Sequence, residues 1–280
     1  MNNLGILAAL GAALAWGTWM VPFKKAGSAN LIQFQALIAV AIGFSGLIIS
    51  LFLGYPINLN IYGLVSGVLW AIASAISLTA VANLGLSKAA PLVSSLVVLS
   101  SFLWGALVFH EVPEGLVLGF LGVGLIVVGV VIVSSTGSMT SRNAKKGLLA
   151  GVIAGLIFGS QLVPVKIGHL SAIDFFFPVC LGIFITGLVI TLLMRAKFTK
   201  DAIGASLICG IIWNLGNLLS LISVSLIGLS KAGPVSQVAA LVAVLWGLFY
   251  FKEVSKKKAR LQVLIGAIIL LGGVAVLGFA

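Results

Sequence analysis

Long apolar stretches separated by short polar segments run through the whole of this 280-residue chain. Each stretch holds about 20 residues, the length that an α-helix needs to cross the hydrocarbon core of a bilayer. The connections are short, so they leave no room for a soluble domain. The pattern predicts an all-α integral membrane protein with ten transmembrane helices, at residues 4–22, 31–53, 61–83, 87–110, 115–134, 147–165, 173–194, 203–227, 230–251 and 261–279.

The two halves of the chain repeat each other about 142 residues apart, and the copies match at polar as well as apolar positions. The matching segments are WGTWMVPFK at 16–24 with FGSQLVPVK at 158–166, GLSKAAP at 85–91 with GLSKAGP at 228–234, and Leu103-Trp104-Gly105 with Leu245-Trp246-Gly247. Each half holds five spans, an odd number, so the second copy enters the bilayer inverted. We therefore predict one membrane domain made of two inverted five-helix repeats, 1–142 and 143–280.

The basic residues give the orientation of these repeats. The connection at 54–60 has no Lys or Arg, whereas its counterpart carries Arg195, Lys197 and Lys200. Short cytoplasmic loops are enriched in basic residues. With both termini outside the cytoplasm, fourteen of the sixteen basic residues face inward. The net charge of +11 is therefore an orientation signal in a multi-pass cell-membrane protein, and we expect no nucleic-acid partner.

The composition also limits the possible functions. Hydrophobic residues make up 61% of the chain and charged residues 8%, and the mean hydropathy is +1.29. No Walker loop, nucleophile triad or pair of acidic residues is present, which argues against an enzyme or an ATP-driven pump. Cys180 and Cys209 both lie inside predicted spans, and no spacing fits a metal site. We expect no metal and no cofactor.

Four lysines and one carboxylate are candidates for charge pairing or coupling. Lys24 is equivalent to Lys166, and Lys88 to Lys231. Lys166 and Lys231 are the two basic residues that break the orientation rule, so either they contact a partner or ligand, or all four lysines reach the interface from helix ends. Asp174 opens the seventh span and is either a helix N-cap or a proton site.

A substrate site is predicted where polar and aromatic residues share a helix face. Trp70, Ser74 and Ser77 have this spacing in span three, and Trp213, Asn217 and Ser220 repeat it in span eight, beside Asn214. An indole plane beside amides suits a sugar, whose C–H face packs on the ring. The alternative is that the serines bond to their own helix and the tryptophans fill gaps. The predicted substrate-binding residues are Trp16, Trp19, Trp70, Ser74, Gln161, Trp213, Asn214, Asn217 and Gln237.

Prolines near span ends are predicted hinges, because a proline removes a backbone donor and permits a break in the helix. Helix capping at the interface is the alternative. These residues are Pro22, Pro91, Pro164 and Pro234. Spans five and ten have almost no polar side chains and are expected to be scaffold or a dimer surface, packing through glycines such as Gly115 and Gly119.

The chain resembles a known family in these motifs. The ten-span inverted plan is similar to the drug/metabolite transporter superfamily. The segments at 16–24 and 85–91, and Leu103-Trp104-Gly105 followed by Glu111, resemble its glucose/ribose porter branch. The resemblance implies a sugar transporter of the cytoplasmic membrane, often a proton-linked uptake system. It also implies a central cavity between two four-helix groups, with spans five and ten set aside.

The sequence thus predicts a secondary transporter for a neutral monosaccharide, working by alternating access, with proton coupling left open. One alternative is a transporter of an anionic metabolite or nucleotide-linked sugar that uses Lys88 and Lys231. Another is a membrane scaffold that transports nothing. The expected partners are a small-molecule substrate and membrane lipids, in a monomer or a homodimer.

Overall fold

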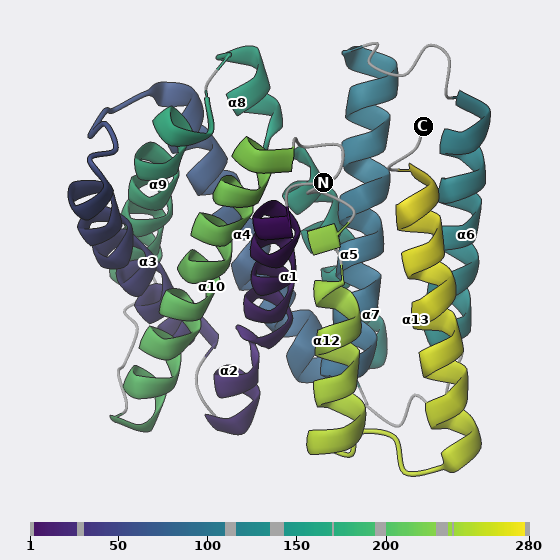
Figure 1. Cartoon of the computed structure of the whole chain (residues 1–280). Coiled ribbons are helices and arrows are strands. Elements are labelled where there is room, and N and C mark those ends of the chain that lie inside the picture. The colour runs from purple at the N-terminus through teal and green to yellow at the C-terminus, as the bar shows by residue number, and fades with distance from the viewer. Residues whose placement is uncertain are drawn as a thin grey trace.

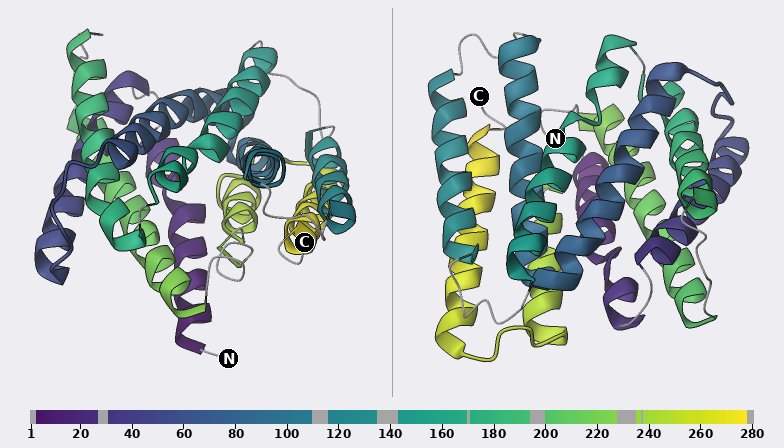
Figure 2. Two further views of the ribbon diagram at one scale, coloured as in Figure 1. Left: turned by 90° about the horizontal axis from the view of Figure 1, so that it is seen from above. Right: turned by 180° about the vertical axis from the view of Figure 1, so that it is seen from behind.

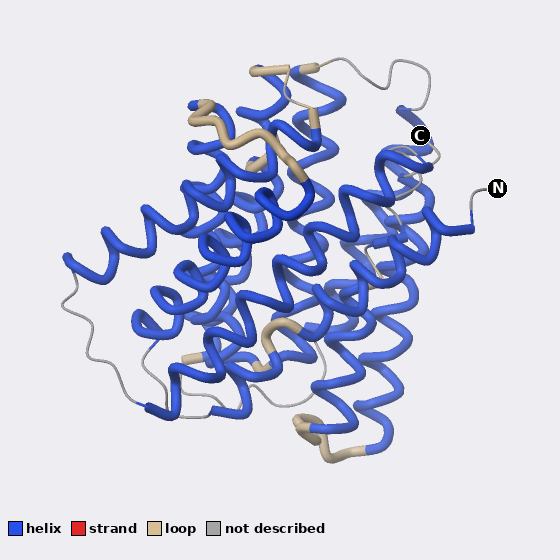
Figure 3. The backbone as a smooth tube through the Cα atoms, turned by 60° about the vertical axis from the view of Figure 1, so that its left-hand side comes forward, coloured by secondary structure: helices blue, strands red, loops and turns tan. Residues whose placement is uncertain are grey.

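The computed structural model describes residues 3–26, 31–109, 116–134, 143–169, 171–193, 200–227, 235–236 and 238–277. These residues form helices joined by turns and loops, with no strand among them (Figure 3). In chain order the helices are α1 (Asn3–Thr18), α2 (Val21–Ala26), α3 (Leu31–Leu53), α4 (Ile61–Leu84), α5 (Leu86–Leu103), η1 (Trp104–Val108), α6 (Leu116–Ser134), α7 (Ala144–Ser160), α8 (Val163–Ile167), α9 (Ala172–Leu193), α10 (Lys200–Ile227), α12 (Ala239–Leu245), η2 (Trp246–Tyr250) and α13 (Lys257–Leu277). The segments η1 and η2 are π-helical.

The surface of this bundle is apolar. Phe52, Val117 and Leu193 are 87%, 75% and 77% exposed. Extended apolar surfaces of this kind need lipid contact, so the all-α membrane prediction is supported. Seven described helical segments are long and apolar enough to cross a membrane: Asn3–Ala26, Leu31–Leu53, Ile61–Leu84, Leu86–Leu103, Ala144–Ile167, Ile173–Leu193 and Ile203–Ser223. The other predicted spans correspond to the shorter apolar helices Val117–Val133 and Ala239–Tyr250 and to α13, so the number ten stays a prediction.

The helices form a main group with one pair set apart at its edge. In the main group, α3 packs on α9 and α10, α4 on α7 and α9, α1 on α10 and α12, and α5 on α7 and α12. The helices α6 and α13 run side by side at one edge (Figures 1 and 2). The helix α2 lies at the bottom of Figure 1 and α8 at its top, so these two short helices mark opposite ends of the bundle.

Two of the predicted hinge prolines coincide with helix breaks. A turn at Trp19 and Met20 separates α1 from α2, and a turn at Gln161 and Leu162 separates α7 from α8. Pro22 and Pro164 lie in the first turns of α2 and α8, where a missing N–H breaks no helical hydrogen bond. By contrast, α5 continues through Pro91. Pro234 lies outside the described residues.

The close contacts of α6 and α13 depend on glycines, and Gly119 is one of those expected. Gly119 faces the ring of Phe102 in α5, and Gly115 lies outside the described residues. The two helix backbones approach each other at Gly129 and Gly273, where an added Cβ would lie 2.7 Å and 2.6 Å from carbonyl oxygens of the facing helix. The hydrophobic pattern predicted the helices, but their contact face depends on how they cross.

Candidate functional site

Aromatic rings from four segments meet in the middle of the main helix group. The ring centroid of Trp70 in α4 lies 4.4 Å from Trp213 in α10, 5.9 Å from Trp19 and 6.0 Å from Phe158 in α7. The three tryptophans are at most 9% exposed. Trp16 lies next to this group, with its Nε1–H donating to the backbone oxygen of Trp213 at 3.3 Å. The predicted tryptophans thus come together, from both halves of the chain, in one aromatic cluster.

Asn217 lies one helical turn after Trp213 on α10 and is 7% exposed. Its side-chain nitrogen has no hydrogen-bond partner among the described residues. A buried amide donor without a partner destabilises a protein by about 1–3 kcal/mol, so such a group in a membrane protein is a candidate ligand contact. Among the predicted amides that the structure describes, Asn217 is therefore the one with a buried donor left without a partner beside the aromatic cluster.

Asn214, although predicted beside it, serves the packing of three helices. Its Nδ2 donates to the backbone oxygen of Ile42 at 3.3 Å and to the hydroxyl of Ser45 at 2.9 Å, both in α3. Its Oδ1 accepts from the thiol of Cys180 in α9 at 3.5 Å. The residue is fully buried. These contacts tie α10 to α3 and α9 and occupy both ends of the amide.

Ser74 is also occupied, by a residue that the sequence analysis did not single out. Its hydroxyl donates to Oε1 of Gln35 at 2.8 Å, and Nε2 of Gln35 donates to the backbone oxygen of Ala71 at 3.2 Å. Ser77 donates to the backbone oxygen of Ser74 at 2.8 Å, as the alternative interpretation of the serines expected. Gln33 and Gln35 are both fully buried in α3. The sequence could have indicated both residues, because amides inside an apolar span need hydrogen-bond partners.

Two indole–hydroxyl bonds connect the segments around the helix breaks. Trp104 Nε1–H at the start of η1 donates to the hydroxyl of Ser160 at 2.8 Å. Trp246 Nε1–H at the start of η2 donates to the hydroxyl of Thr18 at 3.1 Å. Gln161 follows Ser160 and is partly exposed. Each bond joins a residue before 142 to one after it.

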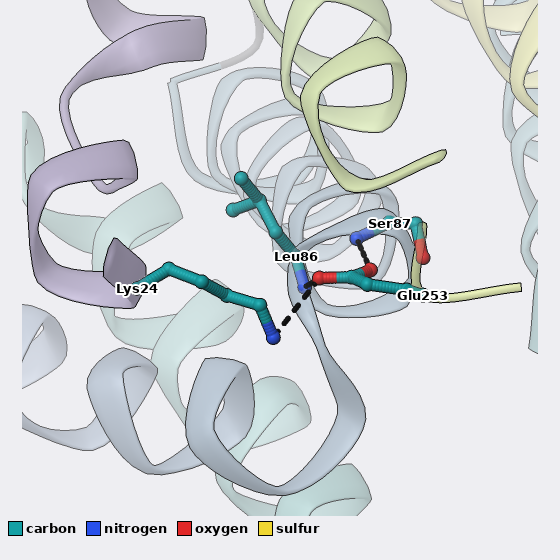
Figure 4. Close-up of polar contacts among 4 residues, drawn as sticks. All are labelled: Lys24, Leu86, Ser87 and Glu253. Carbon is teal, nitrogen blue, oxygen red and sulfur yellow. Dashed lines mark hydrogen bonds and ion pairs between the residues drawn. The ribbon is translucent and has the colours of Figure 1, made fainter. Parts of the chain in front are cut away.

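The three candidate lysines that the structure describes, Lys24, Lys88 and Lys166, lie toward the ends of the bundle. Lys24 in α2 forms an ion pair with Glu253, with its Nζ 3.1 Å from Oε1 (Figure 4). The same carboxylate accepts from the backbone N–H groups of Leu86 and Ser87 at 2.7 Å each, at the start of α5. Lys88 follows Ser87 in the first turn of α5. Lys24 is therefore a pairing residue and does not line the aromatic cluster.

At the opposite end, Lys166 is exposed, and its Nζ lies 4.7 Å from the ring centroid of Phe109. Asp174 lies in the first turn of α9 and accepts from the hydroxyl of Ser171 at 2.6 Å, while its own N–H donates back to that hydroxyl at 3.2 Å. Ser171 thus caps the start of α9 by accepting from the N–H of the third helical residue, and the Asp174 carboxylate holds the Ser171 hydroxyl in place. Asp174 is therefore not the N-cap residue itself, because Ser171 takes that position and Asp174 supports it from the first turn.

Gln237 and Lys231 lie outside the described residues. In the described part of the chain, no three His, Cys, Asp or Glu residues come close enough together to hold a metal ion.

Comparisons with known proteins agree with this architecture. The model of a family described as sugar transport protein matches residues 7–280. The chain is 27% identical to a putative sugar uptake protein of Listeria monocytogenes and 28% identical to the glucose uptake protein GlcU of Bacillus subtilis, in both cases over 99% of each chain. A solved crystal structure shares the fold, with a TM-score of 0.66 at 17% identity, over 98% of this chain and 96% of that chain.

The family match covers nearly the whole chain, and the helical bundle presents the apolar surface that a membrane transporter requires. The resemblance noted from the repeated motifs is thereby confirmed. The chain belongs to the sugar transport protein family and is a membrane transporter, not an enzyme.

Proposed function

We propose that the protein is a secondary transporter that carries a neutral monosaccharide across the cytoplasmic membrane. The observation that carries this proposal is the buried side chain of Asn217, whose Nδ2 has no partner in the described structure and lies one turn from Trp213. In this proposal the amide donates to a sugar hydroxyl, and the indole rings of Trp70 and Trp213 contact the apolar faces of the sugar ring.

The chemistry of these groups matches a neutral polyol. A sugar offers hydroxyls that need hydrogen-bond partners and C–H groups that pack on aromatic planes, so a site for it combines a few polar groups with aromatic walls. The aromatic cluster and Asn217 supply both, and the charged side chains described above lie at the ends of the bundle. Among the relatives, GlcU of Bacillus subtilis is named a glucose uptake protein, so glucose is the first sugar to test.

We further propose alternating access between two inverted five-helix halves, 1–142 and 143–280. Contacts that occur in equivalent pairs support this arrangement. The bond from Trp104 to Ser160 has its counterpart in the bond from Trp246 to Thr18, with both partners shifted by 142 positions in opposite directions. The π-helical segments η1 and η2 are equivalent in the same way. Transporters with inverted repeats bind substrate near the interface of the repeats, where Trp70 meets Trp213.

The anionic alternative gains no support from the described contacts. It requires Lys88 and Lys231 at the substrate, but Lys88 lies in the first turn of α5, directly after the Leu86 and Ser87 N–H groups that bond Glu253. Lys231 lies outside the described residues. A neutral substrate therefore remains the proposal.

Uptake of radiolabelled glucose into proteoliposomes tests the site. Asn217→Ala and Trp213→Ala should each lower the initial uptake rate by about tenfold or more, the effect of losing one contact worth roughly 1.4 kcal/mol. Asn83→Ala is the matched control, because the Asn83 amide donates to its own helix at Thr79 and lies at the end of α4. The yield of folded protein should be similar for all three variants.

Unchanged uptake in both the Asn217 and the Trp213 variant would show that these residues do not form the substrate site. Repeating the wild-type assay with and without an imposed pH gradient separates proton-linked transport from facilitated diffusion. If uptake is absent under both conditions while another solute is carried, the proposed substrate class is wrong.

A further inference from the structure

Glu253 joins three segments of the chain at the α2 end of the bundle. It follows η2, and its carboxylate bonds Lys24 in α2 and the first two N–H groups of α5, at Leu86 and Ser87 (Figure 4). The side chain is only 10% exposed. Hydrogen bonds with a charged partner are about twice as strong as neutral ones, and a helix N-terminus favours a negative charge. The Glu253 carboxylate therefore connects both α2 and α5 to the segment that follows η2.

The backbone around this carboxylate is shaped to admit it. Gly85 has φ +81°, a conformation that residues with a Cβ rarely adopt, and a Cβ there would lie 2.9 Å from the Glu253 carboxyl group. A Cβ on Gly247 would lie 2.5 Å from the Ser87 nitrogen and 2.7 Å from Oε2 of Glu253. Both glycines belong to the segments that repeat along the chain. Glu253 can thus approach α5 closely only because Gly85 and Gly247 have no Cβ.

The contact spans the proposed boundary between the halves. Lys24, Leu86 and Ser87 precede residue 142, and Glu253 follows it. Phe23 and Leu86 adjoin this contact, are 4% and 1% exposed, and belong to the same apolar core as the aromatic cluster, where they form a packed layer. The basic residues near this end place it on the cytoplasmic side by the positive-inside rule. Release of Glu253 would remove the polar bonds that hold this layer shut.

The equivalent positions at the α8 end are less covered. Val165, the counterpart of Phe23, is only partly buried, and α8 has no buried residue. Leu162 is 50% exposed, whereas its counterpart Met20 is partly buried. Equivalent residues in inverted copies would be equally covered if both ends had the same conformation. The difference indicates that the α2 end is the more tightly closed of the two.

We propose that Glu253 is the latch of a cytoplasmic gate. With Glu253 bound to Lys24 and to the start of α5, the two halves are closed at the α2 end. When the carboxylate leaves, α2 and α5 separate from η2 and open a path to the aromatic cluster from the cytoplasm. This inference rests on the proposed alternating access, but not on the identity of the substrate.

A cysteine at position 87 can report on this gate without any substrate. The Ser87 side chain is 1% exposed and its hydroxyl has no partner in the described structure, so Ser87→Cys is a mild change. In membranes exposed on their cytoplasmic face, a membrane-impermeant maleimide should label this cysteine slowly. Adding Glu253→Gln or Lys24→Gln should raise the labelling rate by about tenfold, because the closed population falls. Cys180 and Cys209 are fully buried, and their background is measured in the same variants with Ser87 kept.

Gly247→Ala is a second test that leaves every charge in place. Its methyl group would occupy the space of the Ser87 nitrogen and the carboxylate, so labelling should rise as it does in Glu253→Gln. Lys25→Gln is the control for charge, because Lys25 is exposed beside Lys24. Gly124→Ala is the control for added volume, because nothing lies within 4 Å of its Cβ position. Neither control should change the labelling rate.

The gate would be overturned if labelling were unchanged in Glu253→Gln, Lys24→Gln and Gly247→Ala and only the melting temperature fell. Glu253 would then act only as a helix cap. Sugar uptake is measured separately in the proteins that keep Ser87. Raised labelling together with absence of sugar transport by the wild type would support the gate and reject the proposed substrate. Normal sugar uptake by the wild type, with unchanged labelling in all three variants, would support the proposed substrate and reject the gate.

Discussion

The main helix group and the α6–α13 pair use the same kind of close backbone contact but differ in what they bury. In the main group, Gly67 brings α4 against α9, where an added Cβ would lie 2.8 Å from the Ile183 nitrogen. In the pair, Gly273 brings α13 against α6, where a Cβ would lie 2.8 Å from the Ile126 nitrogen. Among the described residues, the main group contains fully buried polar side chains, including Gln35, Ser74 and Asn214, and the α6–α13 pair contains none.

In the proposed function, this difference separates the region that binds substrate from a supporting one. A polar side chain in a membrane is unfavourable unless it has a partner, so an apolar pair is the simpler way to hold two helices together. The main group nevertheless carries amides, hydroxyls and the aromatic cluster. The extra polar groups there either fix the positions of helices, as Asn214 does, or have no partner in the described structure, as the Asn217 amide nitrogen that we propose binds substrate. The α6–α13 pair holds two helices together without buried polar groups of either kind.

The largest effect in this comparison is expected for Gly67→Ala. The methyl group would press on the backbone of α9 and displace α4, which carries Trp70 one turn further along. Overpacking of this kind destabilises by about 1–3 kcal/mol, and the shift also moves the aromatic cluster. We expect glucose uptake per folded molecule to fall by about tenfold, together with a lower melting temperature. Uptake at the wild-type level in a folded variant would show that the position of α4 is not critical.

Much of the architecture followed from hydrophobic periodicity, because the length of an apolar stretch is a local property of the sequence. The breaks before Pro22 and Pro164 were also predictable, since proline acts on its own helix. The repeat brought out Trp70 and Trp213 as equivalent residues, and they do lie together.

The roles of the polar residues were harder to predict because they depend on partners distant in the chain. Asn214 and Asn217 are chemically identical neighbours on α10, yet one bonds α3 and α9 and the other has a free amide nitrogen. Only the crossing of the helices decides between these outcomes. The partner of Lys24 was unpredictable for the same reason, since Glu253 reaches it across the boundary of the halves.

An intermediate effect is expected for Asn214→Ala. The substitution removes two donated bonds to α3 and one accepted bond from Cys180, while Ser45 keeps its own bond to the backbone oxygen of Ala41. Interhelical hydrogen bonds in membrane proteins average about 0.6 kcal/mol each, so the loss should be about 1–2 kcal/mol. The melting temperature should fall by a few degrees, with uptake per folded molecule reduced less than twofold. A tenfold loss of uptake without a change in melting temperature would instead place Asn214 at the substrate.

The smallest effect on transport is expected for Gly273→Ala, although its steric conflict resembles that of Gly67→Ala. The added methyl group would lie 2.6 Å from the Gly122 oxygen and force α13 away from α6, which lowers the melting temperature by an amount similar to that for Gly67→Ala. Because no residue of the aromatic cluster lies on either helix, uptake per folded molecule should equal that of the wild type. Parallel melting curves and uptake rates for the two alanine variants make the comparison direct, since both add one methyl group at a helix crossing. Equal losses of uptake in the two would show that the α6–α13 pair moves with the transport cycle and is more than an attachment.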